Sequence, residues 1–159
     1  MNVFVFDIDD TIVMHTNERN DYYTTNSNST LSDMLSEFNN LTSYIYTNGT
    51  FSHGSLIVKN LHMDVKRIFA RDVIPYMKPD HRSFGHVYQE ILNENKDIKN
   101  LVFFDDLKDN LRAGKRLGWT TVWINPNTTE KERTTEKERF IDYIFPNIYE
   151  SILYFKLKK

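Results

Sequence analysis

The sequence predicts an α/β fold in three layers, in which a parallel β-sheet is covered by helices on both faces. Two observations indicate this fold class. Short apolar runs rich in β-branched and aromatic residues recur along the chain, and segments with helical periodicity separate them. Such runs are typical of buried strands, and strands that alternate with helices form parallel sheets.

The apolar runs give the predicted strands. The first covers residues 3–6, reads Val-Phe-Val-Phe and leads directly into aspartates. Further strands are predicted over residues 43–46, 67–69, 101–104 and 120–124. Polar residues directly after the second and fourth of these runs indicate that the chain turns there.

Apolar residues spaced by three and four positions predict the helices between the strands. The clearest stripe is formed by Phe84, Val87, Tyr88, Ile91 and Leu92. The predicted helices lie around residues 31–38, 52–61, 84–92, 108–117 and 148–153. Ser29 or Thr30 is the expected N-cap of the first helix, and Gly118 is the expected stop signal after the fourth.

Length and composition predict one domain, 1–159, with its own core, because the chain has 159 residues and 40% hydrophobic content. The net charge of −2 gives no reason to expect nonspecific binding to nucleic acid or acidic membranes. The absence of cysteine excludes disulfides, thiolate metal sites and a thiol nucleophile. No apolar run approaches the roughly 20 residues that span a bilayer. We therefore expect a soluble, cytoplasmic protein without a membrane partner.

Four polar clusters carry the chemistry of the chain. Asp7 and Asp9 follow the first strand, where open α/β sheets place their ligands. The other clusters are Thr47 with Asn48, Lys78, and Asp105 with Asp106. Neighbouring carboxylates repel each other and are costly beside an apolar strand, and a hard cation that bridges them to a phosphate removes that conflict. The clusters predict a magnesium-dependent phosphotransfer site.

Phosphoryl transfer needs a nucleophile, a proton donor and neutralisation of the phosphate charge. Asp7 can supply the nucleophile and form an aspartyl phosphate. Asp9 can protonate the leaving oxygen and later activate water. Thr47 and Lys78 can bind the phosphate, and the acidic group near Asp106 completes the cation site.

These clusters, in this order, closely resemble the motifs of the haloacid dehalogenase-like superfamily. The matching segments are residues 7–11 (DIDDT), 46–49 (YTNG), 78–80 (KPD) and 104–110 (FDDLKDN). The resemblance covers nearly the whole chain and implies a Rossmann-like sheet and phosphatase activity with Mg²⁺. Within the superfamily, the style of the motifs is most similar to pyrimidine 5′-nucleotidases.

The resemblance implies a role for each matching residue. Asp7 would be the nucleophile and a Mg²⁺ ligand, and Asp9 the general acid and base, with its backbone carbonyl on the metal. Asp9 also argues for a phosphatase, because the dehalogenases resembled here lack this second aspartate. Asp106 would be the remaining metal ligand. Asp105 would either support Asp106 without touching the metal or be a ligand itself.

The second and third motifs imply the substrate-binding residues. By the resemblance, Thr47, Asn48 and Lys78 would bind the substrate's phosphate, and Lys78 would also count among the catalytic residues. His53 follows the second motif; we expect a surface or helix-face histidine, with approach to the site as the alternative.

The family pattern is not matched in the segment between the first two motifs. Residues 12–30 are too few for the helical cap domain of many relatives, and we expect only a short lid loop there, without a full cap domain. His15, Tyr22 and Tyr23 in this loop could stack against a substrate ring. An open site suits a bulky substrate, such as a phosphoprotein or a nucleic-acid end, or a site completed by a second copy in a homo-oligomer.

Residues 127–140 stand apart from the alternating pattern. They contain the hexapeptide Thr-Thr-Glu-Lys-Glu-Arg twice in succession. The repeat is too short for a solenoid unit, and we expect a charged surface insertion.

The sequence thus predicts a Mg²⁺-dependent phosphomonoester hydrolase that works through an aspartyl phosphate. A nucleotide is the first substrate class that we expect, and a phosphate on a macromolecule is the second. A catalytically weak domain that only binds its ligand, and a phosphotransferase or mutase, are the alternatives.

Overall fold

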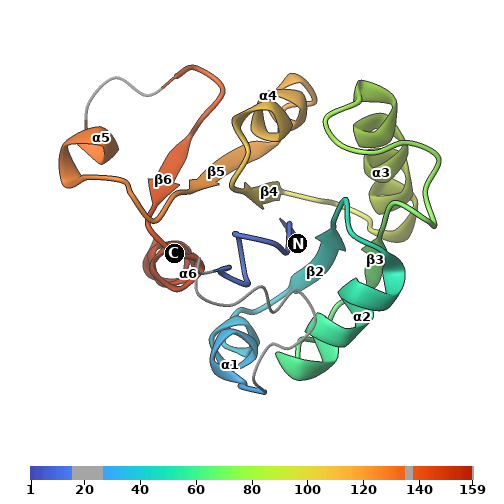
Figure 1. Cartoon of the computed structure of the whole chain (residues 1–159), viewed down its shortest axis with the longest axis horizontal. Helices are drawn as coiled ribbons and strands as arrows, with labels where there is room; N and C mark the ends of the chain where they lie inside the picture. The colour runs from blue at the N-terminus through green and yellow to red at the C-terminus, as the bar shows by residue number, and fades with distance from the viewer. Residues whose placement is uncertain (16–26, 135–137, 159) are drawn as a thin grey trace.

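A parallel sheet of six strands forms the middle layer of the protein (Figure 1). The computed structural model describes residues 1–15, 27–134 and 138–158. The strands are β1 (Asn2–Phe6), β2 (Leu41–Tyr46), β3 (Arg67–Phe69), β4 (Asn100–Asp105), β5 (Thr120–Ile124) and β6 (Tyr143–Phe145). They lie in the order β3-β2-β1-β4-β5-β6, and every pair of neighbours is parallel. The predicted fold class is confirmed.

The central strand β1 is apolar along its length because both of its faces are buried. Val3 and Val5 belong to the core on one face of the sheet, whereas Phe4 and Phe6 belong to the core on the other. On that second face, the ring of Phe6 stacks on Phe104 of β4 with 4.8 Å between the ring centroids. Strands that are covered on both faces lose the alternation of polar and apolar residues, which is why the run reads Val-Phe-Val-Phe.

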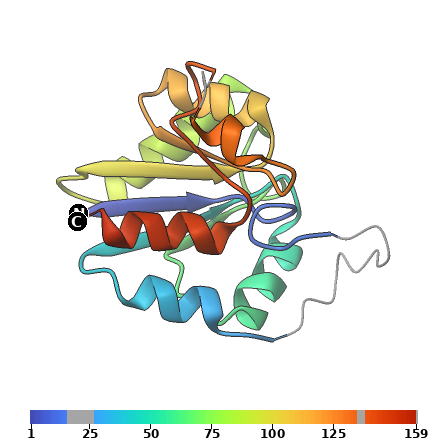
Figure 2. The same ribbon diagram turned by 90° about the vertical axis from the view of Figure 1, so that its left-hand side faces the viewer.

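Helices cover both faces of the sheet, as predicted (Figure 2). They are α1 (Thr30–Ser36), α2 (Phe51–Asn60), α3 (His81–Glu94), α4 (Lys108–Arg116), α5 (Glu130–Thr134) and α6 (Ile148–Leu157). Phe84 of α3 and Leu111 of α4 pack with the core that contains Val3. Leu31 of α1 and Ile57 of α2 pack, together with α6, in the opposite core. None of the helices in the described ranges is long and apolar enough to cross a membrane.

Two details differ from the sequence-based expectations. The sequence analysis did not include β6, which has only three residues and pairs with β5 at the sheet edge. Ser29 occupies the N-cap position of α1, but its hydroxyl donates to the Asp33 carboxylate instead of accepting a backbone N–H. Gly118 does follow α4, with the left-handed φ of 82° that favours glycine at a helix end.

The segments that could hold an additional domain are short. Residues 70–80 join β3 directly to α3, and no inserted domain is present in the ranges that the structure describes. Of the predicted lid loop 12–30, residues 16–26, with Tyr22 and Tyr23, lie outside the described residues. In the charged segment 127–140, the first copy of the repeat begins the short helix α5, and residues 135–137 are not described.

Candidate active site

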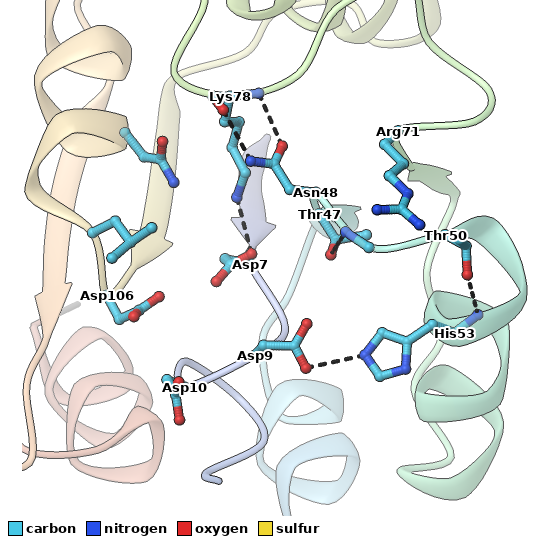
Figure 3. A pocket seen from close by; sticks show the side chains of 13 residues that line it. Asp7, Asp9, Asp10, Thr47, Asn48, Thr50, His53, Arg71, Lys78 and Asp106 are labelled. Carbon is cyan, nitrogen blue, oxygen red and sulfur yellow. Dashed lines mark hydrogen bonds and ion pairs between the residues drawn. The ribbon is translucent and has the colours of Figure 1, made fainter. Parts of the chain in front are cut away.

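A pocket of about 480 Å³ opens at the carboxyl ends of the central strands (Figure 3). Six predicted residues line it: Asp7, Asp9, Thr47, Asn48, Lys78 and Asp106. Asp105 is fully buried and is not part of the lining. The chain leaves β1 toward β2 on one side and reaches β4 on the other, and open α/β sheets bind ligands at such a reversal of strand order.

A tight turn after β1 presents the first acidic cluster to the pocket. The carbonyl oxygen of Ile8 accepts hydrogen bonds from the backbone N–H groups of Thr11, Ile12 and Val13 at 2.9–3.1 Å. Asp10 adopts a left-handed conformation with φ of 61°, and its N–H donates to the carbonyl of Val13 at 2.7 Å. Because of this tight turn, the carboxylates of both neighbours of Ile8, Asp7 and Asp9, line the pocket.

Lys78 is a buried residue of the pocket lining, and all three of its ammonium hydrogens are engaged. Its Nζ donates to Oδ1 of Asp7 at 2.9 Å, to Oδ2 of Asp105 at 2.8 Å and to the carbonyl of Tyr46 at 2.8 Å. Its side chain is only 1% exposed. Burial alone would lower the pKa of Lys78, but the carboxylates of Asp105 and Asp7 outweigh it and raise the pKa. The lysine therefore remains charged.

Asp105 holds Lys78 rather than facing the pocket. Its Oδ1 accepts the backbone N–H of Leu107 at 2.8 Å, and both of its carboxylate oxygens lie 3.1–3.2 Å from the side-chain amide of Asn110. Burial raises the pKa of Asp105, and the nearby Lys78 opposes that shift. With both oxygens occupied, Asp105 is placed to orient the lysine.

Asp7, Asp105 and Asp106 form an acidic group that could hold a metal ion, because one oxygen from each lies within 4.8 Å of the others. The Thr11 hydroxyl lies 3.1 Å from the Asp7 carboxylate and 3.3 Å from that of Asp106. Burial, followed by the negative charges of Asp105 and Asp7, raises the pKa of Asp106. The three carboxylates carry more charge than Lys78, which contacts Asp7 and Asp105, can neutralise. The excess negative charge and the all-oxygen donor set fit a hard divalent cation such as Mg²⁺.

Asn48 and Thr47 connect the end of β2 to the site. The Asn48 amide donates to the carbonyl of Lys78 and accepts the N–H of Lys78, both at 2.9 Å. Asn48 thereby fixes the backbone that carries the lysine; contact with a substrate stays a prediction. The Thr47 hydroxyl oxygen accepts the N–H of Gly49 at 2.9 Å, which leaves its hydrogen available as a donor.

Two histidines, His15 and His53, contact the carboxylate of Asp9. Nε2 of His15 lies 2.7 Å from Oδ1 of Asp9, and Nε2 of His53 lies 3.0 Å from the same oxygen. His53 sits in the first turn of α2, where its backbone N–H donates to Thr50. The expectation of a surface position is wrong for His53, whose side chain is 9% exposed. A histidine on a helix can point toward solvent or toward the site, and the sequence alone does not decide between the two. The short distance in sequence between His53 and the second motif was the only signal for a position at the site.

Arg71 is a pocket residue that the sequence analysis did not single out. It comes two residues after β3, and its backbone N–H donates to the carbonyl of Gly49 at 3.1 Å. The rule that found the other clusters, polar residues at the carboxyl ends of strands, also applies to the predicted strand 67–69. Arg71 could have been found in this way.

The chain has the fold of the haloacid dehalogenase-like hydrolases, as comparison with solved structures shows. The HAD hydrolase YfnB from Bacillus subtilis, solved with magnesium bound, superposes with a TM-score of 0.60 and 19% identity over 84% of this chain. The L-2-haloacid dehalogenase from Xanthobacter autotrophicus, solved with chloropropionic acid covalently bound, gives a TM-score of 0.59 at 16% identity over 79% of this chain. The L-2-haloacid dehalogenase PA0810 gives a TM-score of 0.55 at 14% identity over 78% of this chain.

The likeness to these structures is one of fold. The chain spans 55%, 59% and 54% of the lengths of the three proteins, respectively. No protein-family model matches the chain, and no curated protein sequence matches it.

Proposed function

We propose that the protein is a Mg²⁺-dependent phosphomonoester hydrolase that works through an aspartyl phosphate on Asp7. The observation that supports this most directly is the shared pocket of Asp7 and Asp9, one carboxylate held by Lys78 and the other by two histidines. Two carboxylates in different environments can divide the roles of nucleophile and proton donor. A dehalogenase needs no proton donor at the position of Asp9, so its place in the pocket favours a phosphatase over that activity.

In the proposed reaction, a carboxylate oxygen of Asp7 attacks phosphorus, and the bond from phosphorus to the leaving oxygen breaks. Asp9 donates a proton to that oxygen and then takes one from the water that attacks the aspartyl phosphate, which releases phosphate and restores Asp7. Lys78 keeps positive charge beside the nucleophile, and the Thr47 hydroxyl can donate to a phosphate oxygen.

Asp7 and Asp106 would hold the Mg²⁺, because their oxygens are the ones that both approach each other and line the pocket. The ion would neutralise charge on the bound phosphate. Asp105, whose oxygens are taken by Lys78, Leu107 and Asn110, would act on the metal site only through the lysine.

Hydrolysis of p-nitrophenyl phosphate tests the proposal. We expect turnover with Mg²⁺, its loss on chelation, and a decrease of at least about a hundredfold in Asp7→Asn, because the nucleophile is removed. Asp64→Asn is the matched control, since Asp64 is an exposed aspartate that lies outside the four motifs and outside the pocket lining. No Mg²⁺-dependent turnover, or an Asp7→Asn variant as active as the control, would contradict the mechanism.

A nucleotide is the first proposed substrate class, in line with the motifs. The short connections around the pocket favour a macromolecular phosphate, such as a phosphopeptide or a nucleic-acid end, as the second, since no inserted domain covers the pocket in the described residues. Phosphate release from nucleoside monophosphates, phosphopeptides and 3′-phosphorylated oligonucleotides would separate the two. Transfer of the phosphate to an added alcohol, in place of release, would indicate a phosphotransferase.

A further inference from the structure

Arg71 gives the pocket a positive group that the proposed hydrolysis does not use. The Gly49 contact fixes its backbone, and its side chain lines the pocket and extends toward Thr47 and Thr50 (Figure 3). The next residue, Asp72, is engaged elsewhere, because its carboxylate accepts the N–H of Phe51 at 2.8 Å.

The guanidinium of Arg71 is available to a ligand. Three arginines elsewhere have carboxylate partners within 3.3 Å: Arg67 with Glu90 and Glu94, Arg82 with Asp80, and Arg112 with Asp109. Arg71 has no ion pair and no side-chain hydrogen bond to any residue in the described ranges. Lys78, the other cation of the pocket lining, has all its donors engaged. Among the described residues of the pocket lining, Arg71 is therefore the permanent cation whose donors are free.

Arg71 lies on the side of the pocket where we expect the leaving group of the proposed reaction. Figure 3 shows Arg71 on the same side of the pocket as Thr50 and His53, opposite Asp106. His53 contacts Asp9, the proposed proton donor, so the Asp9 carboxylate extends toward this side and the leaving oxygen would lie near it. The rest of the leaving group would then pass the wall that carries Arg71, whereas the transferred phosphate would lie by Asp7 and the proposed metal site.

We propose that the substrate is a phosphomonoester whose leaving group carries a second oxyanion, and that Arg71 binds that oxyanion. A guanidinium presents paired donors that match the oxygens of a phosphate or a carboxylate. Nucleoside bisphosphates and the phosphorylated end of a nucleic acid have this chemistry, as do phosphorylated carboxylic acids. The inference rests on the proposed function, since it assumes that Asp9 faces the leaving group.

Three substrates of similar size test the inference. Glycerol phosphate has an uncharged leaving group, phosphoglycerate adds a carboxylate, and propanediol bisphosphate adds a second phosphate. Their kcat/KM values are compared at fixed ionic strength for the natural chain, Arg71→Gln, Arg71→Lys and the control Arg116→Gln, an exposed arginine at the far end of α4.

We expect the natural chain and Arg116→Gln to prefer a charged leaving group over glycerol phosphate by about tenfold or more, as for a charge-assisted pair. Arg71→Gln should remove most of that preference, and Arg71→Lys should retain part of it. The relative rates of phosphoglycerate and propanediol bisphosphate identify which oxyanion is bound. No preference in the natural chain, or an unchanged preference in Arg71→Gln, would overturn the inference.

A binding measurement separates this inference from the proposed function. Calorimetric titration of the Asp7→Asn variant with propanediol bisphosphate and with glycerol phosphate needs no turnover. We expect tighter binding of the bisphosphate, and loss of that advantage when Arg71→Gln is added. Equal binding of the two ligands would refute the role of Arg71 even in an active phosphatase, whereas failure of hydrolysis alone would count against the mechanism.

Discussion

His53 ties helix α2 to the carboxylate of Asp9, with Nε2 and Oδ1 3.0 Å apart. His15 reaches the same oxygen from the turn after β1, at 2.7 Å. Oδ2 of Asp9 has no hydrogen-bond partner within the described residues. The two imidazoles therefore fix one oxygen of the proposed proton donor and leave the other to the substrate.

Replacing His53 should slow the reaction most where protonation of the leaving group matters. In His53→Ala, we expect kcat to decrease about tenfold for an alkyl phosphate and clearly less for p-nitrophenyl phosphate, whose leaving group departs without a proton. His53→Gln, which keeps a donor near the position of Nε2, should recover part of the loss. His81→Ala, at an 84% exposed side chain, is the control. An equal decrease on both substrates would mean that His53 has only a structural role.

Lys78 should be a large determinant of stability. In Lys78→Met, the buried carboxylates of Asp7 and Asp105 lose their cation, and we expect the free energy of unfolding to decrease by about 3 kcal/mol at neutral pH. Lys108→Met removes an exposed ion pair with Glu138 and should change it by less than about 1 kcal/mol. Urea denaturation measures both. Similar effects of the two variants would contradict the electrostatic account of the site.

The raised pKa of Asp106 makes metal-free stability depend on pH. A carboxyl whose pKa is higher in the folded state binds its proton more tightly in the folded state than in the unfolded state. Below the unfolded pKa it causes no loss of stability, and the free energy of unfolding then decreases as pH rises from about 4 to about 8. We expect Asp106→Asn to reduce this loss in the presence of a chelator, and Mg²⁺ to stabilise the natural chain more than the variant at high pH. Thermal unfolding at pH 5 and pH 8 tests this. A variant with the pH dependence of the natural chain would contradict it.

Two glycines in helices should respond oppositely to alanine. A Cβ on Gly114 would lie 3.1 Å from the Phe103 ring and 3.2 Å from the Trp119 ring, so we expect Gly114→Ala to destabilise the fold by about 1–3 kcal/mol. A Cβ on Gly85 meets nothing within 4 Å, and Gly85→Ala should stabilise α3 by about 0.5–1 kcal/mol through helix propensity. Stabilisation by both would show that α4 can move away from β4.

The sequence was sufficient for those parts of the site that follow strand ends. Asp7, Thr47 and Asp106 lie directly after or within a residue of strong apolar strands, and a parallel sheet brings such positions to one edge. Lys78 was found through its motif. Its burial between two carboxylates could not be predicted, because that depends on how Asn48 holds its backbone.

Other features depend on side-chain direction, which local patterns do not determine. Asp105 and Asp106 are adjacent, and only the fold reveals that one turns inward to Lys78 and the other to the pocket. The orientation of His53 on α2 is of the same kind. Strand β6 was missed because three residues carry too little periodicity to be distinguished from a loop.

The place of β1 in the sheet has a consequence for partial unfolding. Strands at the two edges, β3 and β6, can separate while β1 keeps its partners β2 and β4. Amide hydrogens of β1 should accordingly be among the last to exchange with solvent, and the proposed nucleophile Asp7 directly follows this most persistent part of the molecule. Arg71 follows the edge strand β3, so local opening there would release the proposed substrate-selecting group and leave the carboxylate of Asp7 in place.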